Sequence, residues 1–320
     1  MKLISFEDIK ALGISPETCY IWAEEMIKNK QTALLPAKIH MGLENNAFCN
    51  VMPSVLDLAG GKIGGVKVVT RYPQRRPSLD SKILLFDAQS GEFISLMDGN
   101  WITAMRTGAV AAHSVMTFAK RGFSTLGMIG LGNTARASLM VLSGILKDRP
   151  LTVRLYCYKD QAELFAKRFE SFKNLNFTFS DSYEDTIRGS DAVISCATYF
   201  KDDIAIDDCF DEGMLVVPVH TRGFTNCDLF FDKVYADDTA HVRDFKNFDR
   251  FRRFAEVHDV LSGAAKGRES DNERILVYNI GVSMHDVYFA FRIYDMLKEL
   301  GRLNTLQTLD LKEPQEKFWI

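Results

Sequence analysis

The sequence lacks the features of a membrane, secreted or nucleic-acid-binding protein. No run of 18 apolar residues occurs, so we expect no membrane-spanning helix. The first residues, Met-Lys-Leu-Ile-Ser-Phe-Glu-Asp, lack the apolar segment of a signal peptide. The formal net charge is −3, which gives no general cationic surface for nucleic acid. These absences favour a cytoplasmic protein without a membrane or nucleic-acid partner.

Cysteine is also sparse and unpatterned. A large, non-secreted chain without a Cys-x-x-Cys pair is expected to keep reduced thiols, with neither disulfides nor a metal site. The six cysteines are Cys19, Cys49, Cys157, Cys196, Cys209 and Cys227.

The chain does have enough apolar residues for a sizeable core. It contains 320 residues, of which 47% are hydrophobic, and this size fits one large or two medium domains. We find no internal repeat and no low-complexity linker. An enzyme is therefore the default class.

One stretch has the pattern of a dinucleotide-binding turn. The apolar run 126–129 has strand length, and Gly130-Leu-Gly132-Asn133-Thr134-Ala135 follows it. In this G-x-G-x-x-A pattern Gly130 permits a tight turn, Gly132 lets a pyrophosphate approach the backbone, and Ala135 allows close packing of the helix. The amides at the helix start would then meet the phosphates. The alternative is an ordinary tight strand–helix turn.

The periodicity around this turn predicts a two-domain α/β protein. Strand-like and helical segments alternate from 124 to 279, which is typical of a parallel sheet covered on both faces. We predict a Rossmann-like NAD(P)-binding domain at 116–286. Residues 1–115, completed by a C-terminal helix at about 287–320, are predicted to form a second, mixed α/β domain, with the apolar tail 318–320 docked. Its predicted strands are 37–41, 47–52 (ended by Pro53), 64–70, 82–87 and 92–97.

A basic run with regularly spaced phenylalanines lies near the end of the second domain. Residues 243–253 are rich in arginine, and phenylalanine recurs at every third position from Phe245 to Phe254. This spacing is typical of a packed helix with a solvated basic face rather than a nucleic-acid site.

Seven short segments spread over the chain together match one known family. They are Val51-Met-Pro53, Gly65-Val-Lys-Val-Val-Thr70, Leu84-Leu-Phe-Asp-Ala-Gln-Ser-Gly91, Met97-Asp-Gly99, Ile102-Thr-Ala-Met-Arg-Thr107, Gly130-Leu-Gly132 and Asn279-Ile-Gly-Val-Ser-Met-His-Asp286. Through them the chain resembles the ornithine cyclodeaminase/mu-crystallin family over nearly its whole length. The resemblance implies a nicotinamide cofactor, a mixed α/β substrate and dimerisation domain at 1–115 through which a homodimer is built, and chemistry at the carbon that bears the amino or imino group of an amino acid. Relatives include cyclodeaminases, alanine dehydrogenases, ketimine reductases and an opine-type dehydrogenase.

The resemblance assigns two catalytic candidates. Lys67 is a charge inside an apolar strand, which is costly unless it is paired or used. In the family this lysine binds the substrate carboxylate or transfers a proton. Arg106 has the planar donors that suit a carboxylate, and the matching family arginine binds it. The alternatives are a lysine that extends to solvent and a structural ion pair.

Four further residues are candidates for substrate binding. Lys38 falls where relatives carry a carboxylate-binding arginine, although a solvated lysine is the alternative. Asn50 occupies the place of a cyclodeaminase glutamate. Arg222 falls at or beside the place of a cyclodeaminase aspartate, and His220 lies at the end of the same strand. Both carboxylates are thus missing, which argues against ornithine cyclodeamination and, through Arg222, favours a substrate with an additional acidic group.

The cofactor is expected to be NADP or NAD, with NADP favoured. NAD enzymes usually carry an acid at the end of the second strand, where this chain has Cys157. Lys159 follows closely and could meet a 2′-phosphate. The matching motifs add Thr107 and Gly281 as cofactor contacts.

Together these residues predict an NAD(P)-dependent amino-acid dehydrogenase or imine reductase, acting at the α-carbon of an amino or imino acid that is opine-like or dicarboxylic. A cyclodeaminase of another diamino acid and a non-catalytic NADP-binding, crystallin-like protein are the alternatives.

Overall fold

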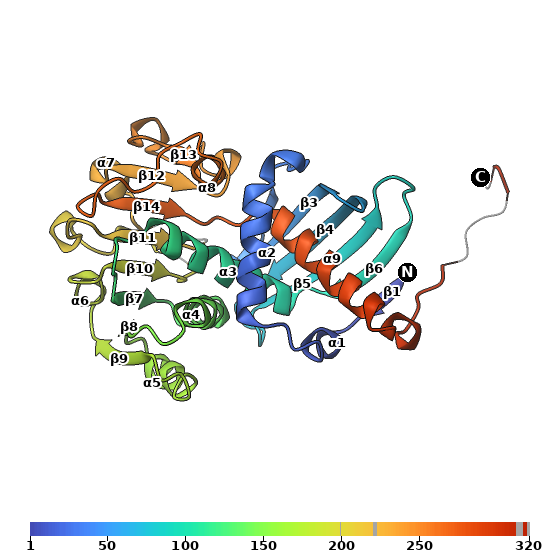
Figure 1. Cartoon of the computed structure of the whole chain (residues 1–320), viewed down its shortest axis with the longest axis horizontal. Coiled ribbons are helices and arrows are strands. Elements are labelled where there is room, and N and C mark those ends of the chain that lie inside the picture. Colours follow the sequence, from blue (N-terminus) through green and yellow to red (C-terminus); the bar gives the residue numbers. More distant parts are fainter. Residues whose placement is uncertain (199, 220–222, 312–315, 319–320) are drawn as a thin grey trace. The chain divides into compact units, whose positions relative to one another are not determined.

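The computed structural model describes residues 1–198, 200–219, 223–311 and 316–318 (Figure 1). The chain divides into two compact units. The first unit comprises 1–13, 33–102 and the chain from 286 onward; the second comprises 14–32 and 103–285. The predicted α/β class with a Rossmann-like and a second, mixed part is confirmed. The domain limits at 115 and 286 stay a prediction.

The first unit is built on a six-stranded sheet with the order β1-β6-β5-β4-β3-β2. All neighbouring strands are antiparallel except β1 and β6, which pair in parallel. Short turns such as Ala88–Gly91 join successive strands, as predicted for this region. The strands are β1 (Lys2–Ile4), β2 (Ile39–Gly42), β3 (Phe48–Leu58), β4 (Gly61–Arg71), β5 (Leu79–Asp87) and β6 (Phe93–Asp98).

The predicted strand break at Pro53 is wrong. Pro53 lies inside β3 and pairs with Val66 of β4. The backbone N–H and C=O of Val55 form hydrogen bonds with Leu34 on the side away from β4. Along an antiparallel strand, successive residues direct these groups to opposite sides, so residues two apart direct them to the same side. The missing N–H of Pro53 therefore faces that same side, between the Leu34 bridge and the end of the β2 pairing at Val51. Proline is tolerated where no neighbouring strand needs its donor.

The two faces of this sheet differ. On one face the helix α9 (Ser283–Glu299) packs so closely that a Cβ on Gly65 would lie 2.8 Å from Val287. In the middle of β3 to β6, the residues that point to the other face are apolar and partly buried or exposed, and we call this apolar surface the open sheet face. Its members are Val51, Pro53, Val55, Val66, Val68, Leu84, Phe86, Ile94 and Leu96. The charged residues Asp80, Lys82 and Asp98 border it where β5 begins and β6 ends.

The second unit is built on an eight-stranded parallel sheet with the order β13-β12-β14-β11-β10-β7-β8-β9. Counted from β7, the strands run 3-2-1-4-5 in the order of a doubly wound nucleotide-binding sheet. The connection reverses direction between β7 and β10. The strands are β7 (Thr125–Ile129), β8 (Leu151–Tyr156), β9 (Leu175–Ser180), β10 (Ala192–Ser195), β11 (Leu215–Pro218), β12 (Lys233–Ala236), β13 (Ala255–Glu256) and β14 (Ile275–Tyr278).

Helices flank this parallel sheet, and α2 packs on α4 and α8. Side-chain caps mark the starts of two helices: Ser5 forms a capping box with Asp8, and the Ser15 side chain accepts from the amide of Thr18. The helices are α1 (Phe6–Lys10), which belongs to the first unit, and α2 (Pro16–Lys28), α3 (Asn100–Phe118), α4 (Asn133–Leu146), α5 (Gln161–Lys167), α6 (Tyr183–Ile187), α7 (Cys227–Phe230) and α8 (Val257–Leu261).

The predicted helix over the basic run is wrong, although its apolar side is packed. Residues 243–254 contain only the 3₁₀ turn Phe248–Arg250, and the phenylalanines gather by successive turns rather than by helical periodicity. Phe245 and Phe251 contact the ring of Tyr278, with centroids 5.1 and 6.0 Å apart. Tertiary burial of the rings thus replaces the helix.

Phe318, the first residue of the apolar tail, does not dock as predicted. Phe318 is 78% exposed, and positions 319 and 320 lie outside the described residues. Within the described ranges, no helix is both long and apolar enough to cross a membrane.

Candidate cofactor and substrate sites

The glycine turn leads from β7 into α4 at the point where the sheet order reverses. Gly130 follows β7 with φ +78°, and a Cβ there would lie 2.3 Å from the backbone nitrogen of Ala197, just beyond β10. Only glycine fits both the left-handed backbone and this close approach. Open α/β sheets bind ligands at this crevice, at the carboxyl ends of the strands.

The start of α4 has the features of a phosphate-binding helix end. Its N-cap is Gly132, which supplies no side-chain acceptor to the first-turn amides, and a Cβ on Gly132 would meet nothing within 4 Å among the described atoms. Ala135 is fully buried against the rest of the unit. Asn133 and Thr134 form the first turn, so their amides lie at the positive end of a 14-residue helix. The turn therefore fits a pyrophosphate.

The end of β8 carries no carboxylate. β8 ends at Tyr156. The backbone amide of Cys157 continues the pairing by donating a hydrogen bond to the carbonyl oxygen of Ser180 at 2.9 Å. Lys159 follows in the left-handed conformation, exposed, with Nζ 5.2 Å from the ring centroid of Tyr158. The first acid after the strand is Asp160, at the N-cap of α5.

Thr107 and Gly281, the two other cofactor candidates, are both tied into the second unit. The Thr107 hydroxyl donates to the carbonyl of Thr103 at 2.7 Å. Gly281 follows β14 with φ +86°, and its amide donates to Asp237 Oδ2 at 2.6 Å. Gly281 thus lies at the carboxyl edge of the sheet, with its turn fixed by Asp237.

Lys67 is buried in the first unit beside a carboxylate that we had not singled out. Its cross-strand neighbours, Met52 and Ile83, are both buried and apolar. Lys67 Nζ lies 2.7 Å from Asp286 Oδ2, and both side chains are at most 1% exposed. Asp286 stands in the first turn of α9. The charge inside the strand is therefore paired, as its cost in an apolar environment requires.

Asn50 lies on the same sheet face as this pair. The register matches Met52 with Lys67, which makes Asn50 a diagonal neighbour of Lys67 at about 7–8 Å between backbone positions. Asn50 Oδ1 is 2.7 Å from Nδ1 of its cross-strand partner His40. His40 donates in this pair, so the amide Nδ2 of Asn50 points away from it. The pairing of β2 with β3 identifies His40 as the partner of Asn50, and the spacing of the two residues in the sequence does not.

The remaining candidates are placed less completely. Arg106 is only 2% exposed on α3 in the second unit. Lys38 is half-buried and immediately precedes β2 in the first unit. His220 and Arg222 lie outside the described residues.

An ion cluster at the carboxyl edge of the parallel sheet escaped the sequence reasoning. Lys30 Nζ lies 2.6 Å from Asp238 and 2.5 Å from Glu256. Burial alone would raise the pKa of Asp238, but hydrogen bonds from His241 and Lys30 lower it to about 2. More than 200 residues separate Lys30 from these acids, so no local sequence pattern could find the cluster.

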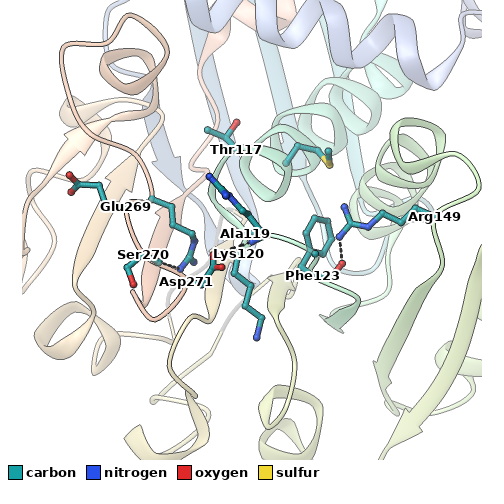
Figure 2. A pocket seen from close by; sticks show the side chains of 12 residues that line it. Thr117, Ala119, Lys120, Phe123, Arg149, Glu269, Ser270 and Asp271 are labelled. Atoms are coloured by element: carbon teal, nitrogen blue, oxygen red, sulfur yellow. Dashed lines mark hydrogen bonds between the residues drawn. The ribbon is translucent and has the colours of Figure 1, made fainter.

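A pocket of about 510 Å³ lies at the opposite, amino-terminal edge of the sheet (Figure 2). Two of its cations have partners: Lys120 Nζ is 2.7 Å from Asp191, and Arg268 donates to the carbonyls of Phe118 and Gly213 at 2.7 and 3.0 Å. These contacts lie at the end of α3 and at the residues just before β10 and β11. We therefore assign the pocket a structural role. Within the described ranges, no group of three or more His, Cys, Asp or Glu residues could hold a metal ion.

Comparison with known proteins places this geometry in a family. The nodulation efficiency protein NfeD of Rhizobium meliloti is 26% identical over 277 residues, covering 83% of this chain and 85% of that protein. The N-((2S)-2-amino-2-carboxyethyl)-L-glutamate dehydrogenase of Staphylococcus aureus is 25% identical over 242 residues, 70% of each chain.

A solved structure shares the fold over almost the whole length. The Δ1-pyrroline-2-carboxylate reductase of Thermococcus litoralis, solved with NADH and L-proline, is 24% identical, with a TM-score of 0.83, over 94% of this chain and 98% of that chain. The sequence profile of the ornithine cyclodeaminase/mu-crystallin family matches residues 19–301. The chain belongs to the ornithine cyclodeaminase/mu-crystallin family.

Proposed function

We propose that the protein is an NAD(P)-dependent reductase of imino acids, which forms or oxidises an amino acid at its α-carbon. The observation that carries the proposal is the buried Lys67–Asp286 pair. The desolvation of two buried charges largely offsets their attraction, so stability alone does not account for the pair, whereas a role of the lysine charge in substrate binding does. The glycine turn at the edge of the parallel sheet supports a nicotinamide cofactor. Relatives named for imine reduction and opine formation support the reaction class.

The residues of this chain would orient the substrate. When bound, the nicotinamide exchanges a hydride with the α-carbon. The ammonium group of Lys67 lies beside Asp286, and we propose that it binds the substrate carboxylate. Arg106 is also proposed as a carboxylate ligand, because its planar donors suit that group.

The test is turnover with defined imines. Purified protein is mixed with NADPH and Δ1-pyrroline-2-carboxylate, or with a 2-keto acid and ammonium, while nicotinamide absorbance and the amino-acid product are followed. We expect oxidation of NADPH matched by the amino acid, and at least a 100-fold loss in Lys67→Met. Release of ammonia from ornithine without net cofactor change would instead identify a cyclodeaminase. Tight NADPH binding without any turnover would identify a crystallin-like binding protein.

For the cofactor we propose a preference for NADPH over NADH. No acid stands between Arg154 and Tyr158 to bind the ribose hydroxyls, and Lys159 is exposed directly after the strand. Fluorescence titration should give at least 10-fold tighter binding of NADPH, and Lys159→Glu should remove most of that difference. Lys167→Glu, an exposed charge reversal on α5, is the matched control. Equal affinities in the wild type would refute the preference.

The substrate side chain is proposed to be acidic or to end in a hydrogen-bond acceptor. Asn50, oriented by His40, presents an amide donor next to Lys67, where a carboxylate would have favoured an ammonium. Arg222, which was predicted to favour an additional acidic group, lies outside the described residues, as does His220. Asn50→Asp should lower the ratio of catalytic efficiencies for oxaloacetate over pyruvate, each with ammonium, by about 10-fold, whereas Asn176→Asp on β9 should leave it unchanged. An unchanged ratio in Asn50→Asp would remove Asn50 from side-chain selection.

A further inference from the structure

A small, closed cavity lies inside the second unit, behind the turn that follows β14. Its volume is about 10 Å³. The elements that enclose it are the end of α2, α3, α8 and the residues just after β12 and β14. The polar side chains that line it are those of Lys30, Ser114, Asp237, His258, Asn279 and His285.

His258 is a residue of the cavity wall and has one ring nitrogen without a partner among the described residues. Its Nδ1 lies 2.8 Å from the carbonyl oxygen of Ile27, so Nδ1 carries the proton and donates. In the neutral ring Nε2 is then an acceptor. The residue is 6% exposed, and within the described part of the chain Nε2 has no hydrogen-bond partner.

Asn279 is a second residue of the cavity wall. Its Oδ1 accepts from the Ser114 hydroxyl at 3.1 Å, which fixes the orientation of the amide. The NH₂ group at Nδ2 is buried and, among the described residues, has no hydrogen-bond partner. The side chain belongs to a residue that is only 2% exposed.

We propose that this cavity binds one water molecule, which accepts a hydrogen bond from Asn279 Nδ2 and donates one to His258 Nε2. An acceptor and a donor left unpaired in one cavity are the pattern that a water satisfies, since it offers both functions. The volume admits about one water and excludes larger ligands.

The water would fix a turn at the cofactor edge of the sheet. Asn279 begins the turn that leads to Gly281, whose amide is held at 2.6 Å by Asp237, another residue of the cavity wall. Ser114, Asn279, the water, His258 and Ile27 then form one hydrogen-bonded chain from α3 through β14 and α8 to α2. Asn279 and His258 are positioning residues in this chain and need not touch the cofactor.

A crystal structure of the wild-type protein at 2 Å or better tests the site directly, whether or not the proposed reaction is found. We expect an electron-density peak at hydrogen-bonding distance, about 2.7–3.2 Å, from both His258 Nε2 and Asn279 Nδ2. An empty cavity, or a rotated Asn279 that pairs directly with His258, would overturn the proposal.

Two variants at His258 test the consequence. His258→Gln keeps a donor for Ile27 and an acceptor for the water, whereas His258→Phe keeps the ring but neither function. We expect His258→Phe to weaken NADPH binding by about 5–10-fold and His258→Gln to stay within about 2-fold of the wild type. Equal NADPH affinity in all three proteins would overturn the link to the turn, and should His258→Phe not fold, the density in the wild-type crystal still decides the site.

Discussion

Lys67 and Asp286 are the residues whose individual substitution should be most costly to the first unit. Removing one member of a buried pair leaves the other charge uncompensated, so Lys67→Met should lower the free energy of unfolding by about 3–5 kcal/mol. The double variant Lys67→Met/Asp286→Asn should recover at least about 2 kcal/mol of that loss. Denaturant unfolding of the four proteins of the cycle measures both values. Additive losses would mean that the two side chains do not act as a pair.

Asp228 should make stability depend on pH. Burial raises its pKa from 3.8 to about 6, although hydrogen bonds from Tyr278 and Asn247 oppose the rise. Because the unfolded chain releases this proton near pH 3.8 and the folded chain only near pH 6, the wild type should lose up to about 3 kcal/mol of stability as pH rises from about 4 to 6.

The variant Asp228→Asn isolates this contribution, because other titrating groups cancel in the comparison. Its unfolding free energy relative to the wild type should rise between pH 4 and 6 and stay level above pH 6. A difference that does not change with pH would show that Asp228 ionises in the folded protein as it does in the unfolded chain.

At the scale of elements, the two glycines of the β7–α4 turn should respond differently to the same substitution. Gly130→Ala places a Cβ 2.3 Å from Ala197 at positive φ, so it should destabilise the second unit by at least about 2 kcal/mol. Gly132→Ala meets no described atom within 4 Å and has φ −83°, so its stability should change by no more than about 1 kcal/mol.

Gly132→Ala should nevertheless raise the dissociation constant of NADPH by more than 10-fold, since its methyl group would occupy the approach of the pyrophosphate. Thermal unfolding and fluorescence titration measure the two effects separately. Normal NADPH affinity in this variant would argue against phosphate binding at the turn.

For the whole molecule we propose a homodimer that covers the open sheet face. The face is apolar along β3 to β6, and Val68 on it is 40% exposed, whereas the opposite face is buried beneath α9. Contiguous exposed apolar surface of this kind is typical of protein interfaces. Leu84→Glu, at the centre of the face, should convert the protein to a monomer in sedimentation analysis. Leu164→Glu, equally apolar but 57% exposed on α5, should leave the assembly unchanged; a monomeric wild type would refute the dimer.

Local chemistry allowed much of this to be predicted from the sequence by itself. The strands of both sheets follow from short apolar runs and turn residues, the helix starts at Ser5 and Ser15 from capping, and the glycine turn between β7 and α4 from the spacing of Gly130 and Gly132. Each of these depends on residues within a few positions of one another, so a linear pattern is enough. Family motifs singled out Lys67, which is buried; its role in the reaction stays a prediction.

Only the tertiary structure decided the features that depend on distant partners. Pro53 is tolerated because no neighbouring strand pairs with its nitrogen side. Phe245 and Phe251 pack against Tyr278 without forming a helix. Asp286, His40 and Lys30 acquire their roles from residues 10 to more than 200 positions away. Burial, ion pairing and cavity formation are properties of surroundings that the folded chain assembles, and no neighbourhood in the sequence contains them.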